Sequence, residues 1–594
     1  MMSRIEQASE NRPTSSGRET ASIETASSPG PKPDVSRWRK KLIILGLGLS
    51  GVTVAAWYYI SRNRSLLEYV PATALAYIEV RDTTRALDAL ERTRAWQTLT
   101  PFLPGAAAWR VPPLPGAHIA LVLTGLELEG EKLTPHWALL VRSPGGAAAA
   151  KAGGHGLESL ARRFLGPLKG ETRQEQGLLL TLYRDPQNRV IFLWTVMDGM
   201  LVAANREDSL RSLRESRENR HLSLAASTTY RTLRAAVDRQ SPVVGFISGK
   251  ALRSLLQRNV LPSASSPMPP PSTAELIETI TAPLALTLTF SVDVEGGEVV
   301  TRYILGLDPN VSASLAEVVN GQAELNSPAI IPADARRITI YRFGDFPGVV
   351  AAIEDVVAKQ LSPLAQIVVR ELVGRMKQSL GWARSDTLAD ALGNESAIVE
   401  WDGDRRLLIV EAREKAKLAM LIGKYLRHAG EPVREDQYQG YSIFSARNRS
   451  TSAFSFINGF LVIGQKREIE ILIDRRHQNR VIAQYPQLAS LFEQGARGAF
   501  EVMVSFDHSE VAQAVLTLRD LAGASAAIPS GDARALYRAV GELAPEMRIS
   551  RWHPEGVYSE SRSPLGPLAL ILSMIEVERV TQSASSASPG HGPQ

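Results

Sequence analysis

The chain of 594 residues contains no cysteine. Disulfide bonds, thiol catalysis, cysteine-ligated zinc, iron–sulfur clusters and a lipid attached through cysteine are therefore excluded. The folded part must be stabilised by burial of apolar side chains alone. Without its tails and its one long apolar run, the chain keeps roughly 515 residues, which is enough for two or more cores.

An excess of charge of one sign is also missing, since 67 basic residues face 62 acidic ones and the net charge is +5. No basic block with interleaved aromatic residues occurs, so we expect no nucleic-acid partner. The nine histidines show no metal-binding spacing, and neither a G-x-S-x-G elbow nor a phosphate-binding loop is present. The sequence thus indicates no catalytic residue, cofactor or metal, and favours a protein that is not an enzyme.

Two short acidic segments have simpler interpretations than a site. Asp402-Gly403-Asp404 resembles the start of a calcium loop but lacks the further ligands, and it lies between two apolar runs. We expect a hairpin turn there. Asp507-His508-Ser509-Glu510 groups polar residue types, and we interpret it as a loop or a helix-start cap.

One apolar run, Leu42 to Ile60, has no charged residue over 19 positions. As a helix it is about 28 Å long, which matches the hydrocarbon thickness of a bilayer. Trp57, Tyr58 and Tyr59 lie at one end of this run, where aromatic rings prefer the headgroup region. We therefore predict a transmembrane anchor over residues 37–64.

The flanking charges predict the orientation of this anchor. Four basic residues precede the run and two follow it, so the N-terminus is expected in the cytoplasm and the body outside, in the periplasm or extracellular space. A signal peptide cleaved after Ala56 is the alternative, and it also exports the body. Small residues four apart, such as Gly46 and Ser50, could let two such helices form a homodimer.

The remaining chain divides into segments of different composition. Residues 1–36 and 581–594 are rich in Ser, Pro and Gly, have little apolar content, and are predicted to be disordered tails. Between them we predict an internal duplication, with a first lobe over 65–325 and a second over 326–580. Each lobe opens alike, with residues 70–80 matching 331–341.

The clearest match between the lobes is a hairpin. Val196 to Val202 aligns without a gap to Phe456 to Val462, with Asp198-Gly199 and Asn458-Gly459 at the turns. Asp-Gly and Asn-Gly between apolar runs predict type I′ turns, because both central residues need positive φ. Hairpins alternating with helices indicate an α+β fold, in which we expect antiparallel sheets with helices packed on one face.

The opening Val70-Pro-Ala-Thr-Ala with Tyr77-Ile-Glu-Val80, and the later strands that follow Gly199 and Gly459, resemble a family of bacterial exported proteins. These proteins carry an N-terminal anchor and a large domain of unknown function. The resemblance implies a location in the cell envelope and duplicated lobes, and it implies no activity.

Four aromatic residues occur near the duplicated strands, namely Tyr77, Trp137, Tyr341 and Trp401. Such residues are usually core, and the alternative is a ligand groove between the lobes. From these patterns we expect a membrane-anchored binding or scaffolding module of the cell envelope. A carrier or sensor of a lipid or another hydrophobic ligand is the second hypothesis, and a hydrolase without a recognisable motif is the third.

Overall fold

The structure is a computed structural model that describes residues 65–102, 115–129, 132–165, 167–238, 240–249, 287–319, 324–349, 388–402, 405–428, 433–446, 453–509 and 530–567, with shorter pieces at 351–378 and 511–516. They belong to one compact unit that begins at Ser65. The predicted tails and the anchor lie outside the described residues. Within these ranges no helix is both long and apolar enough to cross a bilayer.

Twenty strands form one sheet in the described part of the chain. The first ten are β1 (Ala76–Val80), β2 (His118–Glu129), β3 (Lys132–Arg142), β4 (Lys169–Glu175), β5 (Leu178–Arg184), β6 (Val190–Met197), β7 (Met200–Ala204), β8 (Val243–Ile247), β9 (Thr287–Glu295) and β10 (Glu298–Gly306). The second ten are β11 (Arg337–Arg342), β12 (Leu392–Glu400), β13 (Arg406–Ala412), β14 (Val433–Tyr438), β15 (Tyr441–Ala446), β16 (Ala453–Ile457), β17 (Phe460–Gly464), β18 (Ala499–Ser505), β19 (Glu546–His553) and β20 (Gly556–Ser563).

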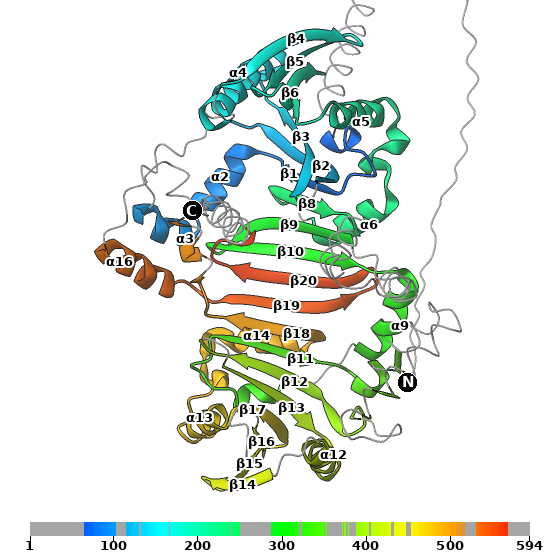
Figure 1. Cartoon of the computed structure of the whole chain (residues 1–594). Coiled ribbons are helices and arrows are strands. Elements are labelled where there is room, and N and C mark those ends of the chain that lie inside the picture. Colours follow the sequence, from blue (N-terminus) through cyan, green and yellow to red (C-terminus); the bar gives the residue numbers. More distant parts are fainter. Residues whose placement is uncertain are drawn as a thin grey trace, which may run out of the picture. The chain divides into compact units, whose positions relative to one another are not determined.

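Every pairing between these strands is antiparallel, and the order of the second ten repeats that of the first ten. The first ten pair in the order β4-β5-β6-β7-β3-β2-β1-β8-β9-β10. The second ten pair in the order β14-β15-β16-β17-β13-β12-β11-β18-β19-β20. We call the two sets the first and second halves; both can be followed in Figure 1.

The halves join through their last strands. β10 pairs with β20 from Val299 opposite Ser563 to Gly306 opposite Gly556. The two equivalent strands are antiparallel neighbours, so the halves share one continuous sheet. We call the β10–β20 pair the seam.

The described helices are α2 (Thr83–Glu91), α3 (Arg94–Leu99), α4 (Gly146–Leu165), α5 (Glu207–Glu218), α6 (Thr228–Val237), α9 (Pro309–Val319), α12 (Lys415–His428), α13 (Lys466–His477), α14 (Pro486–Ala496) and α16 (Ser530–Gly541). Between α2 and α3, Thr93 accepts a hydrogen bond from the Trp96 amide, which starts α3 as a new helix.

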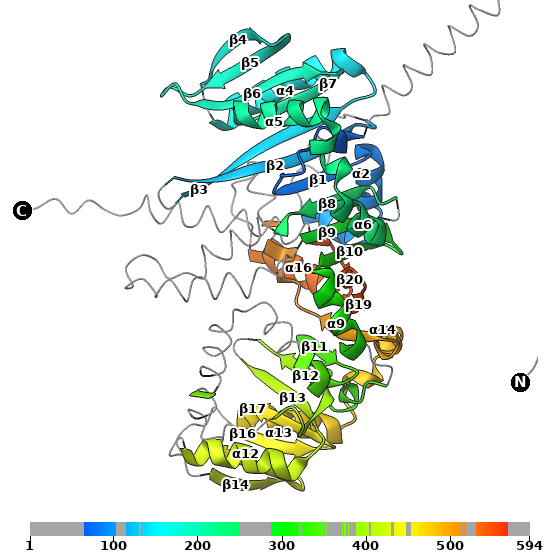
Figure 2. The same ribbon diagram turned by 90° about the vertical axis from the view of Figure 1, so that its right-hand side faces the viewer.

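The helices lie on both faces of the sheet, which corrects the prediction of helices on one face. Leu213 of α5 packs in the same core cluster as Val202 of β7. Leu201, the next residue of that strand, belongs to the cluster beside α4 on the other face. Because successive strand residues point to opposite faces, an apolar strand such as β7 needs cover on both. In the second half α13 and α12 lie beside β16 and β17 (Figure 2).

Two turns show the geometry that Asx-Gly pairs favour. Asp198 and Gly199 have φ values of 50° and 76°, and Asn458 and Gly459 have values of 48° and 83°. Each pair connects two antiparallel strands, β6 to β7 and β16 to β17. Asp198 also accepts hydrogen bonds from Tyr69 and Arg217, so this turn is held to the start of the first half.

Side chains from each half reach the other. α9 follows β10 but packs against β19, where the Trp552 indole donates a hydrogen bond to the Ser312 carbonyl at 2.8 Å. Leu565, which follows β20, packs with Ala95 and Leu99 of α3. The predicted boundary at residues 325 and 326 therefore falls just after a helix that contacts the second half.

Candidate functional site

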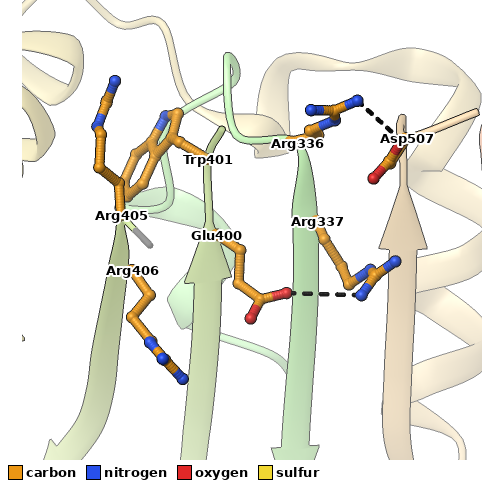
Figure 3. Close-up of a pocket in the computed structure, with 7 residues that line it drawn as sticks. All are labelled: Arg336, Arg337, Glu400, Trp401, Arg405, Arg406 and Asp507. Carbon is orange, nitrogen blue, oxygen red and sulfur yellow. Dashed lines mark hydrogen bonds and ion pairs between the residues drawn. The ribbon is translucent and has the colours of Figure 1, made fainter. Parts of the chain in front are cut away.

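Four arginines lie at the starts of β11 and β13, two strands of the second half that both pair with β12. Arg336 precedes and Arg337 begins β11, Arg405 precedes and Arg406 begins β13, and Glu400 ends β12. Pairing sets Arg337 opposite Glu400 and Glu400 opposite Arg406. With Trp401 and Asp507, these side chains line a hollow of about 270 Å³, which we call the arginine groove (Figure 3).

Arg336 is fixed at one side of the groove by two carboxylates. Its guanidinium donates to Asp507 at 2.9 Å and also to Asp402. Burial of Asp507 acts to raise its pKa, but hydrogen bonds from Ser509 and the charge of Arg336 outweigh burial and lower the pKa. Asp507 also accepts from the Ser509 amide at the helix start, as a cap would.

Arg405 is held at the other side. Its Nε donates to the buried Glu468 at 3.2 Å, and its guanidinium lies 5.7 Å from the centre of the Trp401 ring. A cation over an indole ring is attracted by the electron-rich face. Trp401 is 8% exposed, and its indole nitrogen has no hydrogen-bond partner in the described part of the chain.

The other two arginines are less neutralised. Arg337 is 3.8 Å from the Glu400 carboxylate, near the limit of an ion pair (Figure 3). Arg406 has no acidic partner among the described residues. A guanidinium presents a planar fork of donors that fits carboxylate and phosphate groups. The groove therefore offers positive charge to an anion.

The arginine groove continues along the sheet. Arg337 and Glu400 also line a second hollow of about 390 Å³, together with Thr339, Ile398, Met503, Glu546 and Arg548. Arg337 and Thr339 alternate with Ile338 and Ile340, which belong to the main core cluster of the second half. The second hollow is thus on the sheet face opposite that core.

The arginines belong to the second half only. Pro71 and Pro332 form equivalent isolated β-bridges, one in each half. When the two halves are aligned on these prolines, Leu75 and Ala76 correspond to Arg336 and Arg337. Ala76 pairs with Leu123 and Leu123 with Trp137, as Arg337 pairs with Glu400 and Glu400 with Arg406. The first half thus has apolar side chains at the positions of Arg336, Arg337, Glu400 and Arg406, and His136 at the position of Arg405.

The first half has its own polar cluster, inside its core. The carboxylate of Glu79, a residue 2% exposed, lies 2.5 Å from the His118 ring and 3.7 Å from Arg234. Burial acts to raise the pKa of Glu79, but the hydrogen bond and charge of His118, with the charges of Arg234 and Arg81, lower it overall. At the position of Glu79 the second half has Ile340.

The four aromatic residues predicted to line a groove are not brought together. Tyr77 is fully buried in the core of the first half, and burial raises its pKa well above the ordinary value. Trp137 packs beside the α4 cluster. Tyr341 lies on the face opposite Ile338 and Ile340, so it corresponds to Val80 rather than to Tyr77. Trp401 alone lines the arginine groove.

The sequence contains a signal for the groove that matches no motif of a known site. Arg336-Arg337 and Arg405-Arg406 are two doublets at the starts of predicted strands. Within the described ranges, no three His, Asp or Glu side chains gather in a way that could hold a metal ion. No family model, curated protein or solved structure matches the chain.

Proposed function

We propose that this chain is a membrane-tethered binding module of the bacterial cell envelope and that its arginine groove binds an anionic group of its partner. The observation that carries the proposal is that four guanidinium-bearing side chains, from the starts of β11 and β13, line one hollow. Two of these groups, Arg337 and Arg406, keep donors for a ligand. The first half has none of them at the equivalent positions.

The arrangement favours recognition of an anion over a purely structural role. Structural arginines such as Arg302 are buried and paired with carboxylates. Arg337 and Arg406 instead face a hollow at the sheet surface, where an anion can reach them. Charge-assisted hydrogen bonds to such an anion are the strong kind, and guanidinium groups can make them in pairs.

The location rests on the sequence. The predicted anchor over residues 37–64 and the resemblance to exported bacterial proteins support a body outside the cytoplasm. Phosphate groups are present there on lipid headgroups, and anionic membrane surfaces attract basic clusters. The repeated strand order supports the proposal that two lobes, 65–325 and 326–580, are copies of one unit.

The test is a binding measurement on the full chain in nanodiscs of neutral lipid. Pyrophosphate is titrated by calorimetry at low and at moderate salt, and we expect affinity that falls with salt. Arg406→Gln and Arg337→Gln should each weaken binding about tenfold, because each removes a charge-assisted hydrogen bond. Vesicles with and without phosphatidylglycerol show whether a lipid headgroup or a free phosphate is preferred.

Arg211→Gln is the matched control, because Arg211 is 58% exposed and its ion-pair partner among the described residues is Asp208, on the surface of α5. It should bind pyrophosphate as the parent chain does. Absence of binding, or equal loss in all three variants, would contradict the proposal.

A further inference from the structure

A second hollow lies beside the seam, and residues of both halves line it. Ala236 of α6 comes from the first half and Leu491 of α14 from the second. Its other residues include Ile549 and Arg551 of β19 with Tyr558 and Arg562 of β20. Its volume is about 320 Å³, at the lower end of the range of small-molecule sites. We call it the seam cavity.

The cavity exists because the two equivalent helices cover different strands. α6 packs over β9 and β10, where Leu233 and Val237 form a cluster with Ile304. α14 packs over β18 and β19, and its Leu491 joins the core that includes Ile549. α6 is therefore next to the seam, while α14 is farther from it. Side chains of β19 and β20 are left uncovered between them.

One side of the cavity is apolar. Leu491 and Ile549 belong to the core cluster of the second half, with Met547 packed against it. Ala236 and Tyr558 belong to the small cluster under α6. An apolar group inserted here contacts the edges of two cores and is removed from water, which is favourable in proportion to its area.

The polar side carries one arginine that is not neutralised. Arg562 pairs with Glu295 at 3.2 Å and with Glu560 at 3.0 Å. Arg551 has no ion pair in the described part of the chain, and its Nε is buried without a hydrogen-bond acceptor there. A buried donor on a charged group is costly to leave unpaired. The geometry thus leaves one cation beside an apolar surface.

We propose that the seam cavity binds a small amphipathic organic anion. Its carboxylate pairs with Arg551, and its short alkyl part lies against Leu491 and Ile549. This site is separate from the arginine groove, because the two have no lining residue in common. It recognises charge together with an apolar body, whereas the arginine groove recognises charge alone.

The test uses the full chain in nanodiscs, with empty nanodiscs as the baseline. Hexanoate is titrated by calorimetry, beside acetate, which has the charge without the alkyl part, and hexylammonium, which has the opposite charge. We expect hexanoate to bind at least about tenfold more tightly than either, since both a charged hydrogen bond and apolar burial are involved.

Two variants locate the site. Arg551→Gln should weaken hexanoate binding about tenfold and leave pyrophosphate binding at the arginine groove unchanged. Ala236→Phe fills the cavity from the wall of the first half and should abolish hexanoate binding. Its control is Ala235→Phe, because Ala235 is the exposed neighbour on the same helix.

Circular dichroism establishes whether each variant is folded. If Arg551→Gln does not fold, Ala236→Phe still tests the proposal. Hexanoate affinity that is unchanged in both variants overturns the proposal. Equal binding of hexanoate and hexylammonium overturns it too, as does the absence of any hexanoate binding. Since pyrophosphate is measured in parallel, failure here is distinguishable from failure at the arginine groove.

Discussion

Glu79 is a carboxylate inside the core of the first half, and its charge depends on its neighbours. His118 and Arg234 lie beside it, whereas the second half has Ile340 at the position of Glu79. These partners lower its pKa below 4.5. The unfolded chain then binds more protons than the folded chain just below that pH. The stabilisation from Glu79 is present above the unfolded pKa and is lost as pH falls through the folded pKa.

We expect Glu79→Gln to lower the free energy of unfolding at pH 7 by about 2 kcal/mol, the scale of a hydrogen bond to a charged group. The difference from the parent should shrink as the pH falls through the lowered pKa of Glu79, because the parent carboxylate is then protonated. Urea unfolding at several pH values measures it. Asp208→Asn, at a side chain 78% exposed, is the control and should change little at any pH. A difference that does not depend on pH would contradict the assigned charge.

At the scale of elements, the hairpins were the most predictable part. The turns at Asp198-Gly199 and Asn458-Gly459 follow from two residues each, because positive φ is a local property. Strand β2 was not expected, since a short apolar run such as Ile119 to Leu123 does not distinguish strand from helix.

The candidate site was less predictable than the fold, because it depends on long-range pairing. Arg337, Glu400 and Asp507 are far apart in the sequence, and they meet only because β11 lies between β12 and β18. The predicted aromatic groove grouped Tyr77 with Tyr341, but they lie on opposite faces of their strands. Face assignment requires register, which a single sequence does not supply.

The turn geometry gives a prediction at this scale. Gly459 has a φ of 83°, and a Cβ built there meets nothing within 4 Å. The cost of Gly459→Ala is therefore one of backbone conformation alone, and we expect about 1 kcal/mol less stability. Thermal and urea unfolding measure it. Asn458→Gly is the control, because glycine adopts positive φ freely, and it should stay within a few tenths of a kcal/mol. A neutral Gly459→Ala would mean that this turn does not restrict the hairpin.

For the whole molecule, the orientation of the predicted anchor can be tested, that is, on which side of the membrane residues beyond 64 lie. The basic residues before Leu42 predict a cytoplasmic N-terminus and an exported body. Protease added to spheroplasts should therefore digest the body beyond residue 64, while a tag at the N-terminus stays protected. Immunoblots against both ends measure this, and a cytoplasmic protein serves as the control for lysis. Survival of the C-terminal bulk would refute the predicted orientation.

The continuous sheet has a consequence for how copies of the chain coexist. Among the described strands, β4 and β14 are paired on one side only and form its two outer edges. Both are mostly exposed and densely charged, with Glu171 and Arg173 on one and Arg434 and Glu435 on the other. Charged edge strands disfavour the addition of another strand. Pairing at the seam covers one edge of each half, and β4 and β14 are the edges that remain among the described strands. Copies of the chain at high concentration therefore have little tendency to join edge to edge into fibres.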